Sequence, residues 1–462
     1  MAGAAVTSEG RERARGHTLP SLWTLAGLAV IGVALAVRLI GLGSPGEMLV
    51  DERYYVDGAR SLLERGWEPT TASPVPGGTP AVHPPLGKWL IAAGMAVAGD
   101  RPLGWRLAGA LAGTVTVALV WLTARRLFRD EAAALIAAGL LAVEHLSVVQ
   151  SRTAMLDVFV ALWVVAGLWA LAIDRDAPLP EGRRRRHPWR IAAGVFLGCA
   201  LATKWSGAYV LPFAAGLTAW WEYRRRLGRG DDRRTAAEGT LWGEGPSIIA
   251  AFALIPVAVY VASSAGAFVT GAVTPLSWWQ DQLRVLDFHT NLAAGHPYAS
   301  SALSWLADRR PVAYFYAKPQ VGGVPGASEV LAIGHPLVFF GIVPVWVWAT
   351  FEWARGRGAA LVWPLLFSIA LWVPWVTQDR AMFIFYMTPV VPFIVLLQGA
   401  ALAKLLRSGA GGAVLATVLL LGVVALFWFH WPVLTGAAIT QQEWAVRVAD
   451  WSRIPFWRPN WV

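Results

Sequence analysis

Long apolar runs separated by arginine-rich segments divide this chain from end to end. Most runs approach about 20 residues with almost no charge, the length that a helix needs to cross a hydrocarbon core of roughly 30 Å. Backbone polar groups in lipid must be bonded internally, and unbroken apolar runs favour helices over alternating strands. Only 15% of the 462 residues are charged, against about 25% in soluble domains. We therefore expect an all-α polytopic membrane protein.

The basic segments indicate which loops are cytoplasmic, because cytoplasmic loops carry an excess of Lys and Arg. This rule also accounts for the net charge of +10 without a nucleic-acid partner. The basic segments lie at about 11–15, 124–130, 181–190, 222–234, 352–358 and 403–408. The apolar runs lie at about 22–42, 104–123, 132–149, 153–173, 190–206, 207–221, 246–263, 334–351, 359–376, 382–402 and 411–430. Paired as out-and-back hairpins, they predict about eleven crossings.

This topology divides the chain into three parts. Residues 1–20 form a cytoplasmic tail, residues 21–430 form the transmembrane domain, and residues 431–462 form an external tail. Two long external loops are expected at about 43–103 and 265–333. The first run lacks a cleavage site and is too long for a signal peptide, so we expect a retained helix in the cell membrane.

The short apolar run at 86–99 has to be a non-spanning helix in this scheme. A full crossing there would place the later basic segments on the wrong side. At about 14 residues it is short for a span and suits an interfacial or re-entrant helix on the outer side.

Polar residues gather at the outer boundary, where they are costly unless they are paired, hydrated or functional. Each has an ordinary structural explanation when taken alone. A lysine can extend to the interface, Arg152 can anchor a helix with Asp157 as its partner, and single histidines usually pack. The combination, on one side of the membrane, suits a reaction between a water-phase acceptor and a phosphate-bearing lipid. The candidates are Asp51, Glu52, His83, Lys88, Arg152, Lys204 and His289.

Several other chemistries lack support in the sequence. No zinc-ligand spacing, Walker A motif or G-x-S-x-G motif occurs, and the single Cys199 excludes an internal disulfide. A transporter would place ionisable residues within its spans, near the midplane. Here the spans hold few charges, which disfavours a transporter. A structural scaffold would not need carboxylates clustered with cations at one boundary.

Blocks along most of the chain resemble the protein O-mannosyltransferase family, in its actinobacterial form without MIR domains. In order, they are "VDERYYVDGA", "HPPLGKWLIA", "SRTAMLDVF", "ATKWSG", "FH…HPYASSALSW…RRPVAYF" and "RAMFIFYMTPVVPF". The resemblance implies a GT-C membrane glycosyltransferase fold with about eleven transmembrane helices and juxtamembrane helices in the first external loop.

The resemblance also implies an activity. Mannose would move from polyprenyl-phosphate-mannose to Ser or Thr hydroxyls of secreted or translocating proteins, with inversion. The alternative is a polyprenyl-phosphate-sugar transferase that acts on a lipid or glycan. The expected partners are the lipid donor, the polypeptide acceptor, membrane lipids and the protein translocation machinery. No metal is expected to be required.

The family's acidic motif maps onto Asp51, which is expected to act as the general base, with Glu52 in a supporting role. The leaving phosphate is already acidic, so a second carboxyl acting as general acid is not needed, in contrast to glycosidases. Arg106 matches the family's essential arginine. Lys88, Arg152 and Lys204 are further cations for the phosphate, and His83 and His289 could orient sugar or phosphate.

Overall fold

The computed structural model describes residues 21–71, 74, 80–177, 187–291 and 295–451. The expected tail at 1–20 and the end of the chain from 452 lie outside these residues. The helices of the first half are α1 Leu22–Leu39, α2 Glu52–Arg65, α3 Leu86–Ala98, α4 Pro102–Phe128, α5 Glu131–Val143, α6 His145–Ser151, α7 Asp157–Asp176, α8 Pro188–Thr203, η1 Trp205–Val210 and α9 Leu211–Leu227. The later helices are α10 Arg233–Glu238, η2 Gly239–Glu244, α11 Gly245–Ile249, η3 Ala250–Leu254, α12 Ile255–Ser263, α13 Ala265–Val269, α14 Pro275–Thr290, α15 Ala302–Trp305, α16 Pro336–Phe340, α17 Ile342–Ala354, α18 Val362–Trp372, η4 Val373–Trp375, η5 Ile384–Met387, α19 Val391–Leu406, α20 Ala410–Thr435 and α21 Gln441–Arg447.

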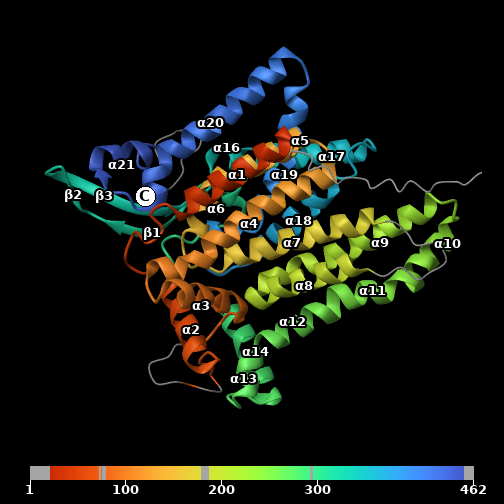
Figure 1. Ribbon diagram of the computed structural model, residues 1–462, viewed down its shortest axis with the longest axis horizontal. Coiled ribbons are helices and arrows are strands. Elements are labelled where there is room, and N and C mark those ends of the chain that lie inside the picture. The colour runs from red at the N-terminus through yellow and green to blue at the C-terminus, as the bar shows by residue number, and fades with distance from the viewer. Residues whose placement is uncertain (1–20, 72–73, 75–79, 178–186, 292–294, 452–462) are drawn as a thin grey trace, which may run out of the picture.

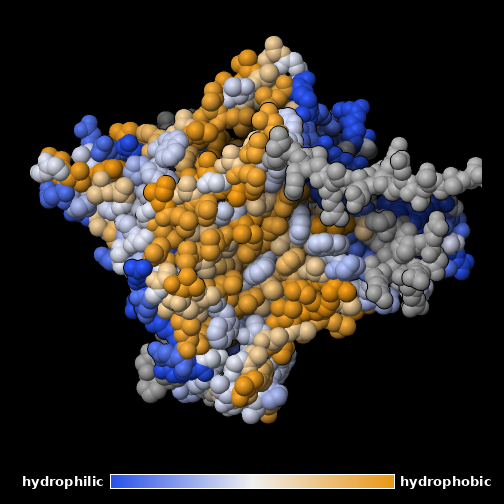
Figure 2. All heavy atoms as spheres, in the orientation of Figure 1, coloured by the Kyte–Doolittle hydropathy of each residue, from blue (hydrophilic) through white to orange (hydrophobic). Residues whose placement is uncertain are grey.

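A bundle of long apolar helices forms most of the molecule (Figure 1). Within it, α7 packs against α4 and α8, and α19 packs against α5. Apolar atoms cover the middle of the visible face, with polar atoms toward the ends (Figure 2). This distribution fits a lipid-facing belt, since lipid-exposed surfaces of spanning helices are apolar.

Within the described residues, six helices are long and apolar enough to span a membrane, or seven when the bent pair α5 and α6 counts as one. Three of the six are α1, α4 and α7, α10 to α12 run on as a fourth, and α16 with α17 and α20 complete the set. The count of eleven is therefore not confirmed and stays a prediction. It would be completed by crossings of α8, α9, α18 and α19, three of which are shorter apolar helices.

The short apolar run at 86–99 forms a helix, α3, which has 13 residues, and its non-spanning character stays a prediction. At 1.5 Å per residue it is about 20 Å long, less than the hydrocarbon thickness. It packs against α2 and α4 at one end of the bundle (Figure 1). The segment between α1 and α4 thus contains two helices, α2 and α3, which form one wall of the site described below.

A small antiparallel sheet lies beside the bundle, although no strands were expected. Its strands are β1 Val312–Ala317, β2 Gln320–Val321, β3 Val324–Ala332 and β4 Ile439–Thr440. β3 pairs with each of the other three. The hairpin between β2 and β3 turns on Gly322 and Gly323, with φ of 59° and 83°. A two-residue Gly-Gly loop is a hairpin signal, because its type I′ geometry needs positive φ at both positions.

The segment expected to be a C-terminal tail is folded where the structure describes it. α20 runs on to Thr435, past the expected boundary at 430. β4 then pairs with β3, and Trp444 in α21 donates a hydrogen bond from Nε1 to Glu329 Oε2 at 2.5 Å. This part of the chain therefore closes over the sheet.

Candidate active site

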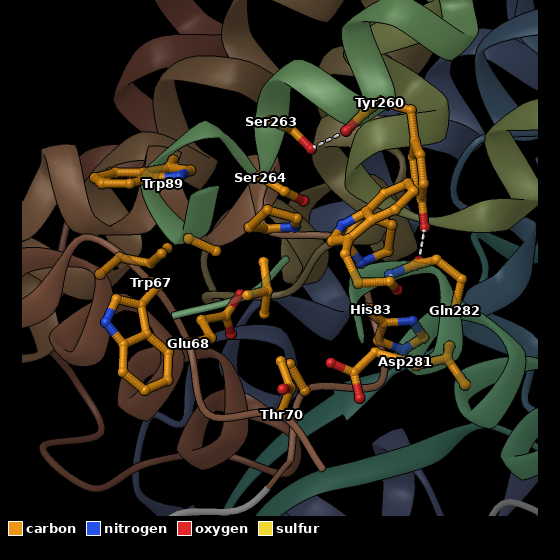
Figure 3. A pocket seen from close by; sticks show the side chains of 18 of the residues that line it. Trp67, Glu68, Thr70, His83, Trp89, Tyr260, Ser263, Ser264, Asp281 and Gln282 are labelled. Atoms are coloured by element: carbon orange, nitrogen blue, oxygen red, sulfur yellow. Dashed lines mark hydrogen bonds between the residues drawn. The ribbon is translucent and has the colours of Figure 1, made fainter. Parts of the chain in front are cut away.

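A cavity of about 890 Å³ lies between the segment that joins α1 to α4 and the segments around α14 and before α19. Its walls come from α2, the segment that links α2 to α3, α14, and the stretch before α19. Four of the eight candidate residues line it, namely Asp51, His83, Lys88 and His289. A smaller chamber of about 80 Å³ adjoins it and shares Glu68, His83 and Asp281 with it (Figure 3).

Asp51 is held at the cavity by the tight turn that joins α1 to α2. Val50, just before it, has φ of 39°, which a β-branched residue rarely adopts and which costs energy. The backbone N–H of Glu52 donates to Leu49 O at 2.8 Å. The Leu49 N–H donates in turn to Glu52 Oε2 at 2.9 Å. These two bonds close the turn around Val50 and fix the position from which Asp51 enters the cavity.

Glu52 does not line the cavity and is fully buried. Its Oε1 accepts from Arg106 Nε at 2.8 Å and from the Ala154 N–H at 2.8 Å. Its Oε2 also accepts from Arg106 Nη2, at 3.0 Å. Adjacent helical residues point in different directions, so Asp51 and Glu52 face different surroundings. Glu52 joins three segments of the chain and serves the local architecture.

Arg106 is likewise buried away from the cavity. Besides Glu52, it donates to the carbonyls of Leu42, Pro45 and Glu47, at 3.3, 2.7 and 2.8 Å. A guanidinium has five N–H donors, and all five have partners here. No donor of Arg106 is left for a lipid phosphate in this conformation.

Arg152 also binds backbone rather than the cavity. Its guanidinium donates to the carbonyls of Val37, Arg38, Ile40 and Gly41, at 2.9, 3.3, 2.7 and 3.3 Å. The last carbonyls of a helix lack intrahelical partners and favour a cation. Arg152 therefore caps the end of α1.

Lys204 lies beside the cavity, next to the lining residue Tyr386. Its Nζ is 4.7 Å from the Tyr386 ring centroid and 2.9 Å from each carboxylate oxygen of Asp157. The expected pairing of Asp157 with Arg152 is wrong, since Asp157 pairs with Lys204. Lys88 is also paired, with its Nζ 2.5 Å from Glu68 Oε1 and 2.9 Å from His83 O. Two candidate cations are thus neutralised by carboxylates.

Arg380 is a cavity cation that the sequence reasoning missed. Its Nη1 lies 3.4 Å from His289 Nδ1, and its guanidinium lies 5.7 and 5.9 Å from the ring centroids of Trp375 and Tyr386. Within the described residues no ion pair joins Arg380 to a carboxylate. The signal in the sequence is the short polar turn "TQDR" (377–380) between two apolar runs, which contains this arginine.

His83 and His289, two of the three histidines that line the cavity, are neutral supports. His289 Nε2 lies 2.8 Å from Val82 O, so this nitrogen carries the proton and Nδ1 can accept from Arg380. The His83 and His289 rings stack, with centroids 5.2 Å apart. Burial first, and then Arg380 and Lys204, lower the pKa of His289; burial and the surrounding cations hold the pKa of His83 well below its usual value.

Asp51 lies in a mixed electrostatic environment. Burial, the largest influence, raises the pKa of its carboxyl group. Lys204 acts in the opposite direction, and Asp157 adds to the increase. The carboxylate of Asp51 is therefore a stronger base than an exposed aspartate, and its ionised form is favoured by a nearby cation.

Comparisons with known proteins bear on this arrangement. The family model "Dolichyl-phosphate-mannose-protein mannosyltransferase" matches residues 98–272, and "C-terminal four TMM region of protein-O-mannosyltransferase" matches residues 276–452. A Mycobacterium tuberculosis protein named polyprenol-phosphate-mannose--protein mannosyltransferase is 32% identical over 95% of this chain and 92% of its own length. A Corynebacterium glutamicum protein of the same name is 32% identical over 82% of this chain and 83% of its own.

Solved structures share the fold. The protein O-mannosyltransferase Pmt1-Pmt2 complex of S. cerevisiae matches with a TM-score of 0.77 at 14% identity, covering 93% of this chain and 92% of that one. ArnT of Cupriavidus metallidurans in the apo state matches with a TM-score of 0.54 at 18% identity, covering 90% and 75%. The molecule is therefore a membrane protein of the GT-C glycosyltransferase fold, as expected from the sequence. The chain belongs to the protein O-mannosyltransferase family.

Asp51 and Glu52 have different surroundings, so substitutions at the two positions should affect stability differently. Replacing Glu52 by Gln leaves a buried Arg106 without its counter-charge, which costs about 3–5 kcal/mol. Asp51→Asn removes a charge that burial already disfavours, so stability should be unchanged or slightly higher. Thermal unfolding of both purified variants in one detergent would check this. Equal unfolding midpoints would contradict the architectural role of Glu52.

Proposed function

We propose that this chain transfers mannose from polyprenyl-phosphate-mannose to Ser or Thr hydroxyls of proteins, with inversion at the anomeric carbon. The observation that carries the proposal is the nearly full-length similarity to mycobacterial proteins of that name. The cavity supports it, because a carboxylate and an arginine without a carboxylate partner among the described residues face the same space.

In the proposed reaction Asp51 is the general base. The acceptor oxygen forms a bond to the anomeric carbon while its proton passes to Asp51, and the bond from that carbon to the phosphate oxygen breaks. Polyprenyl monophosphate leaves. A base placed within hydrogen-bond reach of the attacking hydroxyl contributes about 10²–10⁴-fold to such a step.

Arg380 is the residue that we assign to the departing phosphate. A preorganised cation stabilises charge that develops in the transition state, and Arg380 has no ion pair with a carboxylate among the described residues. His289 orients it through the contact between Nη1 and Nδ1. Lys204 supports the phosphate from beside Tyr386, and Lys88 and His83 shape the wall. The roles expected of Arg106 and Arg152 become indirect, through the position of the first loop.

The proposed setting is the cell membrane, with the N-terminus in the cytoplasm and the cavity outside. The arginine pattern supports this orientation. α4 and α9 end with basic residues in their last turns, away from the end of the bundle that carries α2 and α3 (Figure 1). The acceptors would be secreted polypeptides, with the translocation machinery as a further partner.

The activity test uses polyprenyl-phospho-mannose with a Ser/Thr-rich secreted peptide. The wild-type chain should mannosylate the peptide, and Asp51→Asn should lower the rate by about 10²-fold or more. A lipid or glycan acceptor run in parallel addresses the alternative, which gains weight from a Pseudomonas aeruginosa aminoarabinose transferase 35% identical over 39% of this chain. Transfer to the glycan but not the peptide would favour that alternative, and an unchanged rate for Asp51→Asn would reject Asp51 as the base.

Transfer should also depend on pH in a defined direction. The base must be ionised, so the rate falls as pH decreases through the pKa of Asp51. Burial raises that pKa, so the acid limb should lie above about 3.9, the usual value for aspartate. The profile of kcat/KM against pH measures it, and the residual activity of Asp51→Asn should lack this limb. A limb at or below the usual value would contradict the assignment.

We further propose that no metal ion is needed. The described residues contain no group of three or more His, Cys, Asp or Glu side chains that could hold a metal ion, and the leaving phosphate has arginine and lysine side chains nearby. Purified enzyme treated with EDTA should keep its full transfer rate. Loss of activity with recovery on addition of Mg²⁺ or Mn²⁺ would overturn this proposal.

A further inference from the structure

Helix α14 forms one wall of the cavity and presents three different faces. The face toward the cavity carries Asp281, Val285 and His289. Asp281 is 4% exposed, and its Oδ1 accepts from Thr71 Oγ1 at 2.8 Å. Through His289, this face also positions Arg380. The helix α14 is therefore part of the site.

The opposite face of α14 is a stripe of large apolar side chains that are exposed in the structure. Leu276, Trp279, Leu283 and Leu286 are 67%, 56%, 48% and 50% exposed. Their spacing of three, four and three residues places them within one arc of about 80° on a helix with 3.6 residues per turn. We call these four residues the apolar stripe.

A third face, beside the apolar stripe, is polar and exposed. It carries Gln280 and Asp287, each of which follows a stripe residue directly. A helix with one face on protein, one apolar face exposed and one polar face exposed has the pattern of a helix that lies in a membrane interface. The polar face then meets water and the apolar stripe meets acyl chains.

The position of α14 agrees with this reading. The candidate span Arg233–Ser263 ends shortly before it, and the intervening α13 carries Val269, which is 86% exposed. Gly266 in α13 packs so closely on the end of α2 that a Cβ there would lie 1.8 Å from Gly66 O. The chain therefore leaves the span and stays beside the first external loop, at the membrane boundary.

Hydrogen bonds connect α14 to α12, the last helix of the preceding candidate span. Trp205 Nε1 donates to the Tyr260 hydroxyl at 2.9 Å, and that hydroxyl donates to Gln282 Oε1 (Figure 3). Tyr260 lies in α12, near the end of the span. The cavity side of α14 is thus held by protein, while its apolar stripe is exposed.

We propose that α14 lies in the membrane leaflet on the cavity side, with the apolar stripe among the lipid acyl chains. The membrane then forms the outer support of the cavity wall that carries Asp281 and His289. Because the apolar stripe and the cavity face are opposite sides of one rigid helix, a change in its seating in the lipid moves His289, and with it the contact to Arg380.

Spin labels at two pairs of neighbouring residues test the seating of the helix. The single Cys199 is first replaced by Ala, and single cysteines are placed at Trp279, Gln280, Leu286 or Asp287 in the full chain in phospholipid nanodiscs. Labels at 279 and 286 should be relaxed by oxygen, which partitions into lipid. Labels at 280 and 287, about 100° around the helix, should be relaxed by a water-soluble nickel chelate. Equal chelate access at all four positions would overturn the proposal, as would dipolar broadening at 279 and 286 that shows a second copy.

A matched pair of charge substitutions tests the effect on the site, and this arm rests on the proposed function. Leu286→Glu places a carboxylate on the apolar stripe, and Gln280→Glu places the same charge on the polar face. With a long-chain donor in liposomes, the first should lower mannosyl transfer about tenfold and the second should leave it unchanged. Both should match the wild type in detergent, which shows that they are folded. Equal rates for the two variants in liposomes would overturn the proposed coupling between the apolar stripe and the site. Absence of transfer by the wild type would instead reject the proposed function. In that case the spin-label result still decides whether α14 lies in the membrane leaflet.

Discussion

The buried ion pair between Glu52 and Arg106 is the interaction on which the site depends. Glu52 binds the turn before α2 and the backbone at Ala154, while Arg106 binds three carbonyls of the segment that follows α1. Each group thus satisfies the other's charge and several backbone groups that would otherwise be buried without partners. Neither residue lines the cavity. Together they hold Val50 in its left-handed conformation and so place Asp51 at the cavity wall.

Pairing of charges around the cavity leaves few groups free to act on a substrate. Lys88 is satisfied by Glu68 and Lys204 by Asp157, so these lysines bring little net charge. Arg380 differs, since its described contacts are a neutral histidine and aromatic rings. Anionic ligands bind where a cation is available without breaking an existing ion pair, and this separates Arg380 from the other candidates.

More of the architecture than of the site could be predicted from the sequence. Arginine-rich segments and apolar runs predicted the helical membrane class and the short helix α3, because charge and length act on every crossing alike. The same reasoning placed Asp51, His83, Lys88 and His289 on one side, and the structure brings them to one cavity. It could not distinguish an arginine that faces a cavity from one that binds backbone, as Arg106 and Arg152 do. That difference depends on which carbonyls lie nearby after folding.

The strands were missed for a related reason. The aromatic residues around Tyr314 and Tyr316 suit a membrane-interface belt and a strand equally well, and only the Gly322-Gly323 turn favoured a hairpin. The pairing of β4 with β3 joins residues more than a hundred positions apart. No local pattern in the sequence predicts such a contact.

The placement of Asp51 and Arg380 on one cavity has a consequence for the charge balance of the proposed reaction. When Asp51 takes a proton it loses a negative charge, and the phosphate gains one as its bond to the sugar breaks. The total charge of the cavity is the same before and after. The chemical step then amounts to the movement of one negative charge from the α2 wall toward Arg380, and a low-dielectric cavity resists such a movement far less than it resists the creation of new charge.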